Sequence, residues 1–173
     1  MAEIINISPL IHSDIEELIT LVNSAYRGES SKKGWTTEAE LLDGIRASRP
    51  SIESMLQQPG AMILAAKTEA GCIAGCVYLK KDATHLCLGM LTVAPDIQAK
   101  GIGKQLLLAA ENYGREMDCT SIIMSVIDVR HELIDWYMRK GYQSTGETKP
   151  FPNDPAFGIA KQPLQFIILE KRL

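Results

Sequence analysis

The sequence predicts an α/β protein with a mixed, twisted central sheet of about six to seven strands flanked by helices. Two observations support this fold class. Between residues 61 and 93, three runs of β-type residues follow one another across short turns, which is typical of an antiparallel meander. Beyond residue 100, helical and strand patterns alternate, and the continuous apolar run at residues 121–127 indicates a strand covered on both faces. The 173 residues fit one domain that spans residues 1–173.

The first sixty residues predict one strand followed by helices. Residues 3–7 have the composition of a strand. Ser13, with Glu16 three residues later, forms a capping-box pattern that opens a helix ending near Tyr26. Two further helices are expected in this half, at residues 37–48 and at residues 51–58.

The remaining elements are predicted from apolar runs and from the glycine and proline residues that separate them. The meander strands are expected at residues 61–67, 72–80 and 84–93. A glycine-containing loop after Pro95 then precedes a long helix at residues 101–117. The last elements are expected to be strand 121–127, helix 131–140 with Gly141 as its C-cap, strand 142–148, a proline-rich loop and strand 164–170.

Composition and charge exclude several classes of protein. The formal net charge of −3 argues against a nucleic-acid partner, which favours basic proteins. The N-terminus lacks the pattern of a signal peptide, and no run of about 18 apolar residues predicts a membrane span, so we expect a cytoplasmic protein without a membrane partner. The four cysteines form no CxxC pair and the three histidines are scattered, so no metal site is expected.

The loop between the meander and the long helix carries two glycines, Gly101 and Gly103. A dinucleotide fingerprint requires a third glycine where Leu106 stands. A Walker A loop requires glycine at position 98 and serine or threonine at position 105, but this sequence has Gln98 and Gln105 there. Neither nucleotide-binding pattern is therefore present, and a turn that uses glycine for tight packing remains one alternative.

An anion site is the other interpretation of the glycine loop. The first amides of a helix have no partner within the helix, and the helix dipole favours negative charge there. Gly101 and Gly103 remove the Cβ atoms that would hold a diphosphate away, and Lys100 and Lys104 add positive charge. A diphosphate bound at this loop is physically reasonable.

Two motifs resemble the GNAT superfamily of N-acetyltransferases. The first is the strand end Leu91-Thr92-Val93-Ala94-Pro95 followed by Gln98-Ala99-Lys100-Gly101-Ile102-Gly103, which resembles the family's acetyl-coenzyme A loop. The second, residues 135–142, contains Tyr137, Gly141 and Tyr142 and resembles the helix end of the family. The resemblance covers roughly residues 60–147 and implies a GNAT-type fold with acetyl-coenzyme A as co-substrate.

The resemblance assigns the coenzyme-binding residues one by one. It implies that the backbone of Leu91, Thr92 and Val93 holds the pantetheine arm and the thioester carbonyl. The diphosphate is expected to be wrapped by the segment Gln98, Ala99, Lys100, Gly101, Ile102, Gly103 and Lys104. Arg130 stands where many members carry an asparagine that contacts the coenzyme, so Arg130 either contacts the coenzyme or caps the preceding strand.

Tyr137 matches the family tyrosine that faces the coenzyme sulfur. The ordinary pKa of a phenol is about 10, so at neutral pH its hydroxyl is protonated and can donate to a departing thiolate. Without the resemblance, Tyr137 would be interpreted as an aromatic core residue between Trp136 and Met138.

The base and the acceptor pocket are less well defined. No acid lies between residues 83 and 94, where many relatives carry a glutamate; His85 is a weak candidate, and water or an acid from elsewhere are alternatives. The acceptor is expected to meet a mixed-charge loop, which residues 151–158 would close from the other side. The candidate acceptor residues in that loop are Tyr26, Arg27, Glu29 and Trp35.

Two functions are compatible with these residues. The first is acetyl transfer to a primary amine of a small or amino-acid-like acceptor, directly within a ternary complex, because neither motif contains a cysteine. The second is a non-catalytic acyl-coenzyme A sensor or interaction module on the same fold. The oligomeric state is left open, with a homodimer among the alternatives.

Overall fold

The computed structural model describes residues 5–98 and 100–173, with the side chains of Gly28 and Glu29 excepted. Seven strands form one sheet in the order β1-β3-β4-β5-β6-β9-β7, and two short strands, β2 and β8, pair beside it. Only β5 and β6 run parallel within the large sheet, which confirms the predicted mixed α/β class. The strands are β1 (Asn6–Pro9), β2 (Leu42–Asp43), β3 (Ala61–Lys67), β4 (Ile73–Asp82), β5 (His85–Val93), β6 (Ser121–Ile127), β7 (Gln143–Pro150), β8 (Ile159–Ala160) and β9 (Gln165–Arg172).

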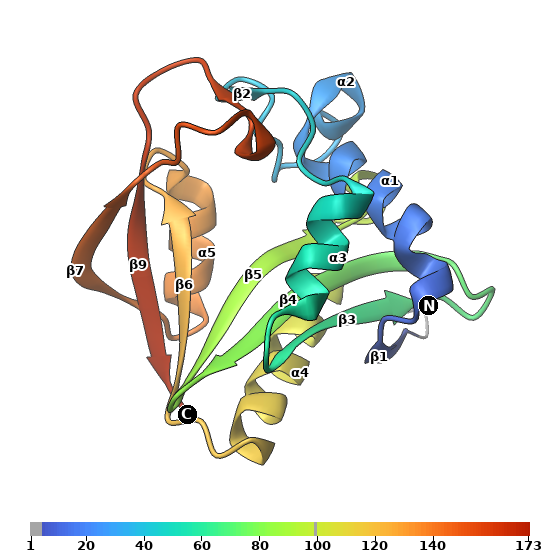
Figure 1. The fold of residues 1–173 in the computed structure, drawn as a ribbon, viewed down its shortest axis with the longest axis vertical. Helices are drawn as coiled ribbons and strands as arrows, with labels where there is room; N and C mark the ends of the chain where they lie inside the picture. The colour runs from blue at the N-terminus through green and yellow to red at the C-terminus, as the bar shows by residue number, and fades with distance from the viewer. Residues whose placement is uncertain (1–4, 99) are drawn as a thin grey trace.

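Helices cover both faces of the sheet, as Figure 1 shows. On one face, α1 (Ile15–Tyr26) and α3 (Arg49–Gln57) pack against β3, β4 and β5. On the other face, α4 (Ile102–Glu116) packs against the same strands, and α5 (His131–Arg139) follows β6. The four-residue helix α2 (Gly28–Ser31) follows α1, and 3-10 turns occur at His12–Asp14, Pro95–Ile97 and Pro155–Phe157. None of the described helices is both long and apolar enough to cross a membrane.

The sheet splays apart between its two parallel strands. β5 and β6 pair only at their first residues, where His85, Leu86 and Cys87 lie opposite the start of β6. Beyond this point the two strands diverge, so that the sheet opens as a V in Figure 1. A register shift against β4 accompanies Met90, whose φ of 51° marks a bulge in β5. The candidate functional site lies at the opening of the V.

The predicted helix at residues 37–48 is wrong. This segment forms turns and the two-residue strand β2 instead. The side chain of Asn23 on α1 holds the segment, because its Oδ1 accepts hydrogen bonds from the backbone N–H groups of Arg46 and Ala47 at 2.7 and 2.9 Å. Gly44, with a φ of 89°, adds a left-handed turn that interrupts a helix. These tertiary contacts override the helical pattern of the segment.

Two helix starts also differ from the sequence-based expectation. Ser13 lies in a 3-10 turn, and α1 begins after Asp14 without a side-chain cap. The capping box belongs instead to α3, where Ser48 is the N-cap and its side chain accepts from the N–H of Ser51. The other predicted helices and strands from residue 61 onward are confirmed to within a few residues.

Candidate active site

The glycine loop ends at an uncapped helix N-terminus. Gly101 is the N-cap of α4 and has a φ of 85°, in the left-handed region that favours glycine. No side chain caps this helix, and its first helical hydrogen bond runs from the N–H of Gln105 to the carbonyl of Gly101. The preceding amides, those of Ile102, Gly103 and Lys104, therefore have no partner within the helix and can receive an anion.

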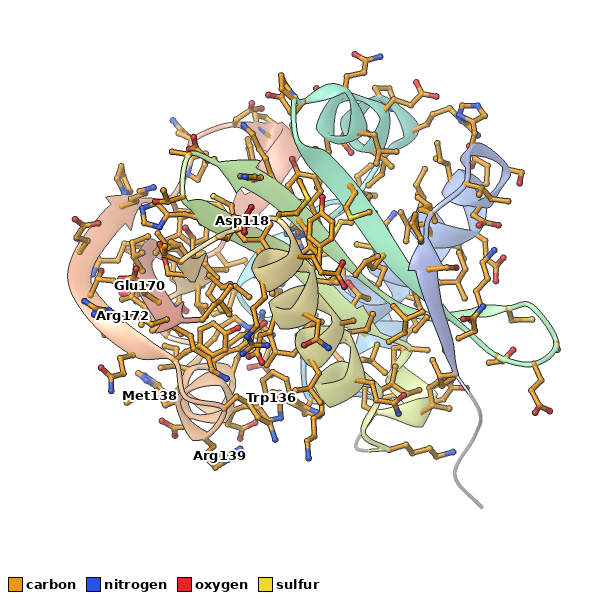
Figure 2. All side chains as sticks on the ribbon, turned by 90° about the horizontal axis from the view of Figure 1, so that it is seen from below. Asp118, Trp136, Met138, Arg139, Glu170 and Arg172 are labelled. Carbon is orange, nitrogen blue, oxygen red and sulfur yellow. The ribbon has the colours of Figure 1, made fainter. Side chains whose placement is uncertain are left out.

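A cavity of about 230 Å³ adjoins this helix N-terminus, and we call it the coenzyme-side cavity because the sequence resemblance predicts that this loop binds the coenzyme. A Cβ atom built on Gly103 would lie 3.6 Å from Val93 and 3.8 Å from the ring of Trp136, so a longer side chain at residue 103 would fill the cavity. Figure 2 shows Trp136 on the side of α5 that faces α4, with Met138 on the opposite side. The cavity is lined by Trp35, Thr36, Leu91, Val93, Gln98, Gly101, Gly103, Lys104, Leu133, Trp136, Tyr137 and Lys140.

Gln98 fastens the segment at residues 35–36 to the end of β5. Its Nε2 donates to the carbonyl of Val93 at 2.9 Å and to Oγ1 of Thr36 at 2.8 Å. Its Oε1 accepts from the N–H of Trp35 at 2.9 Å. Gln98 thereby holds Trp35 near Trp136, with the two ring centroids 6.3 Å apart. The loop glutamine thus shapes the wall of the cavity.

A second cavity, of about 110 Å³, opens between the diverging strands β5 and β6, and we call it the acceptor-side cavity. Leu91, Leu133 and Tyr137 line both cavities, so the two adjoin at these residues. The second cavity is lined by Tyr26, Arg27, Glu38, Leu42, Arg46, Leu88, Gly89, Met90, Leu91, Met124, Ser125, Val126, Ile127, Arg130, Leu133, Tyr137, Phe151, Phe157 and Phe166.

Tyr137 lies at the junction of the two cavities. Its side chain is buried, with 4% of the residue exposed, and its hydroxyl forms no hydrogen bond within the described part of the chain. Burial raises the pKa of Tyr137 above the ordinary value of 10.0, and the neighbouring Tyr26 adds to this shift. The phenol therefore stays protonated at neutral pH, and its proton is available to an atom bound at the junction.

Three buried charges form an ion cluster at one wall of the acceptor-side cavity. Glu38 accepts from Arg27 through Oε1 and from Arg130 through Oε2, both at 3.3 Å. The three side chains are between 5% and 9% exposed. Burial lowers the pKa of Arg27, and Glu38 opposes that shift. Because each guanidinium is paired with the same carboxylate, the cluster holds the segment around residues 36–38 against α1 and α5.

Tyr26, at the end of α1, joins this cluster to β5. Its hydroxyl donates to the carbonyl of Leu91, and the guanidinium carbons of Arg46 and Arg130 each lie 5.8 Å from its ring centroid. Burial raises the pKa of Tyr26, while the charge of Arg130 lowers it. Tyr26 is therefore a neutral donor inside a cationic surrounding.

The structure divides the predicted site residues between the two cavities. Leu91 and Val93 reach the coenzyme-side cavity, whereas the side chain of Thr92 is buried and donates to the carbonyl of Met90. Ile102 lies in the core and Lys100 is exposed. Ala99 and the side chain of Glu29 lie outside the described residues.

Two further predicted site residues each line one of the cavities. Arg130 lines the acceptor-side cavity and donates to the carbonyl of Thr36 at 2.5 Å, and it is not part of the coenzyme-side lining. Trp35 lines the coenzyme-side cavity, where Trp136 is its neighbour.

Sequence reasoning missed several residues of the candidate site, among them Glu38, Arg46, Leu133 and Trp136. Phe157 lies in the loop of residues 151–158 that the sequence predicts to lie near the acceptor. Glu38 and Arg46 fell within the helix wrongly predicted at residues 37–48. Leu133 lies four residues before Tyr137 on a single helix, and this spacing could have indicated that the two side chains share a face. The adjacent position of Trp136 gives no such signal.

The acids and bases near the junction are few. His85 lies at the closed end of the V, where its Nδ1 is 2.7 Å from Oγ of Ser121, and it lines neither cavity. Within the described residues, Glu38 is the one carboxylate that lines the acceptor-side cavity, and two guanidiniums hold it. Both carboxylate oxygens of Glu38 are therefore already engaged by guanidiniums.

Splayed parallel strands with an uncapped helix N-terminus beside the opening define the acetyltransferase fold that the sequence motifs predict. The chain belongs to the acetyltransferase (GNAT) family, whose model matches residues 16–142 and thus most of the chain. No curated protein matches the sequence.

Solved structures support the same fold. The ribosomal-protein-S18-alanine N-acetyltransferase of Escherichia coli superposes with a TM-score of 0.72 at 14% identity, covering 98% of this chain and 94% of that one. An acetyltransferase of the GNAT family from Staphylococcus aureus Mu50 gives 0.68 at 20% identity, with 98% and 99% covered. The PaiA N-acetyltransferase of Thermoplasma acidophilum, solved with coenzyme A, gives a TM-score of 0.65 at 20% identity, with 98% of this chain and 99% of that one covered.

Proposed function

We propose that the protein is an acetyl-coenzyme A-dependent N-acetyltransferase that acts on a primary amine of a small or amino-acid-like molecule. The observation that carries this proposal is the position of Tyr137. Tyr137 is a buried residue that lines both the coenzyme-side and the acceptor-side cavity, and its hydroxyl has no hydrogen-bond partner in the described part of the chain. A proton donor at that junction suits a reaction in which one bound molecule passes a group to another and leaves as a thiol.

The coenzyme-side cavity supplies what an acyl-coenzyme A needs. The free amides of Ile102, Gly103 and Lys104, together with the helix dipole, are suited to a diphosphate. Along β5, the carbonyls of Leu91 and Val93 accept from side chains, because that edge of the strand has lost its neighbour β6. The N–H groups on the same edge are thus available to the amide-rich pantetheine arm. The coenzyme A bound to the Thermoplasma relative is consistent with this assignment.

The proposed step is a direct transfer. The acceptor nitrogen attacks the thioester carbonyl carbon, so that a C–N bond forms and the C–S bond breaks. Tyr137 donates its hydroxyl proton to the departing sulfur, and the proton lost by the amine returns to the phenolate through solvent. No cysteine of the described chain lines either cavity, so an acyl-cysteine intermediate is not proposed.

The shortage of an unpaired general base near Tyr137 favours a second candidate function. Glu38 is the only carboxylate that the described residues bring to the acceptor-side cavity, and it is already paired. A non-catalytic acyl-coenzyme A sensor would need no base, and the site is compatible with that role.

Thiol release distinguishes the two candidates. The protein is incubated with acetyl-coenzyme A and a panel of amines, and free coenzyme A is measured with a thiol reagent while products are identified by mass. We expect at least one amine to give release above the hydrolytic background, with a product heavier by one acetyl group. Tight coenzyme binding without release for any amine would instead support the sensor.

A further inference from the structure

The wall of the acceptor-side cavity carries more positive than negative charge. Three guanidiniums, those of Arg27, Arg46 and Arg130, line the cavity, whereas Glu38 is the one carboxylate among its described lining residues. Two of these guanidiniums are paired. Arg27 and Arg130 share the carboxylate of Glu38 and also donate to backbone carbonyls, Arg27 to those of Ile45 and Phe157 at 3.3 and 3.2 Å.

Arg46 is the guanidinium left without such a partner. It forms neither a hydrogen bond nor an ion pair through its side chain with the described residues. It lies over the ring of Tyr26, with its Cζ 5.8 Å from the ring centroid. Its backbone is fixed, because Asn23 accepts from its N–H at 2.7 Å. Arg46 is therefore a preplaced, half-buried cation that faces a cavity.

Much of the remaining cavity surface is apolar. The aromatic rings of Phe151, Phe157 and Phe166 come from the late loop and β9, and Phe157 is 49% exposed at the surface. Strands β5 and β6 contribute aliphatic and methionine side chains, among them Leu88, Met90, Met124, Val126 and Ile127. A ligand that fits this surface has an apolar skeleton and carries a negative group on the side of Arg46.

We propose that Arg46 binds an anionic group of the acceptor, so that the preferred acceptor is an amine with an apolar skeleton and a carboxylate or phosphate-type group. This inference rests on the proposed acetyltransferase function. A guanidinium presents a planar fork of donors that matches either anion. The acceptor's negative charge would then offset the uncompensated charge of Arg46.

The same charge favours the reactive form of the amine. An ammonium group near several guanidiniums is destabilised, so the pKa of a bound amine falls and its neutral, nucleophilic form gains population. The cationic cavity thereby takes over part of the work of a general base, which the described residues do not offer in an unpaired form. The anionic group keeps the acceptor bound although its amine is repelled.

Matched acceptors test the proposal directly. Leucine, 1-amino-3-methylbutylphosphonate, leucinamide and 3-methylbutylamine share one aliphatic chain and differ in the charge beside the amine. We expect kcat/KM for leucine or the phosphonate to exceed that for the two uncharged analogues by about 10- to 100-fold, the range of a charge-assisted hydrogen bond. The better of the two anions identifies the acceptor class.

Substitution of Arg46 separates its role from packing. We expect R46Q to reduce the ratio of kcat/KM for the anionic acceptors to kcat/KM for the neutral acceptors to near one. The main cause would be a higher KM for the two anionic acceptors. R46K, which keeps the charge without the planar fork, is expected to retain part of the preference. R115Q, at an exposed arginine of α4 outside both cavities, is the matched control and should change nothing. The proposal would be overturned if the unaltered protein had equal kcat/KM values for neutral and anionic acceptors, or if R46Q left the ratio of these values unchanged.

A binding measurement keeps this proposal distinct from the proposed function. Calorimetry compares 4-methylpentanoate with 4-methylpentan-1-ol, neither of which can accept an acetyl group. Binding of the carboxylate alone, lost in R46Q, supports the anion site even if no amine releases thiol, in which case only the transferase assignment fails. Equal binding of acid and alcohol counts against the anion site even if acetyl transfer is observed.

Discussion

The hydroxyl of Tyr26 donates a hydrogen bond to the main-chain carbonyl of Leu91, which joins the end of α1 to the part of β5 that no longer pairs with β6. Leu91 lines both cavities, so this bond also fixes the wall that the two bound molecules would share. A contact made for folding therefore sets the geometry of the candidate site.

Loss of that bond is expected to cost stability. Tyr26→Phe keeps the ring but leaves a buried carbonyl without its donor, which typically costs about 1–3 kcal/mol. Urea unfolding followed by circular dichroism measures the change. Tyr113→Phe, at a half-buried tyrosine on α4 outside both cavities, should differ little from the unaltered protein. Equal effects of the two substitutions would contradict the role assigned to Tyr26.

Removal of the Tyr137 hydroxyl is expected to slow turnover while leaving coenzyme affinity almost unchanged. A positioned proton donor contributes roughly 10²- to 10⁴-fold to a rate, so Tyr137→Phe should lower kcat within that range. Steady-state thiol release gives kcat, and calorimetry gives the affinity for coenzyme A. An unaltered kcat would reduce Tyr137 to a packing residue.

A charged side chain at residue 103 is expected to abolish coenzyme binding in a folded protein. Gly103→Glu would fill the space between Val93 and Trp136 and place a negative charge at the helix N-terminus. Gln105→Glu adds the same charge two residues further along the helix at an exposed position and serves as the control. Calorimetry with coenzyme A should show loss of binding only for Gly103→Glu, and equal affinities of the two variants would exclude a diphosphate site at this loop.

Loss of the only carboxylate in the buried ion cluster is expected to lower the stability of the protein. Glu38→Gln would leave Arg27 and Arg130 facing each other without a counter-charge, and breaking a buried pair in this way costs about 3–5 kcal/mol. Glu53→Gln breaks an exposed pair with Arg49, which is worth about 1 kcal/mol or less. Denaturant unfolding of both variants checks the difference.

Stability is expected to fall in alkaline solution. Burial raises the pKa of Cys76 from 9.0 to about 12, and it raises the pKa values of Tyr26, Tyr137 and Tyr142 above 10.0. The unfolded chain releases these protons at lower pH than the folded chain does. The stabilising contribution is therefore complete below pH 9, declines first through Cys76, and declines further above pH 10 through the tyrosines.

Each such group contributes a slope of about 1.4 kcal/mol per pH unit once the unfolded chain is ionised. Urea midpoints measured from pH 8 to pH 11 should therefore fall progressively. Tyr137→Phe should show a shallower decline than the unaltered protein, because one buried phenol is missing. A flat profile over this range would be incompatible with the buried environment of these groups.

The coenzyme side could be predicted from sequence because its residues are close together along the chain. The end of β5, the glycine loop and the first turn of α4 are contiguous, and local patterns determine all three. Tyr137 lies on another element, and only the family resemblance connected it with the loop. The strand patterns were likewise local, whereas the placement of β9 between β6 and β7 depends on long-range pairing that no periodicity reveals.

The acceptor side could not be predicted, because distant residues assemble it. Arg46 reaches the cavity because Asn23 binds its backbone, and Glu38 is held by an arginine 92 positions later. A helix-like pattern at residues 37–48 concealed both side chains. Fixed positions for buried charges depend on partners that only the folded chain brings together.

The divergence of β5 from β6 gives the sheet two inner edges in addition to the outer edges formed by β1 and β7. Outer edges expose unpaired backbone groups to other chains, and natural proteins protect them against aggregation. The inner edges instead face the acceptor-side cavity, which residues of α1, α5 and the late loop also line; the opening between the two strands is visible in Figure 1. The molecule thereby keeps unpaired strand edges inside the fold, next to the candidate site, and not only at its periphery.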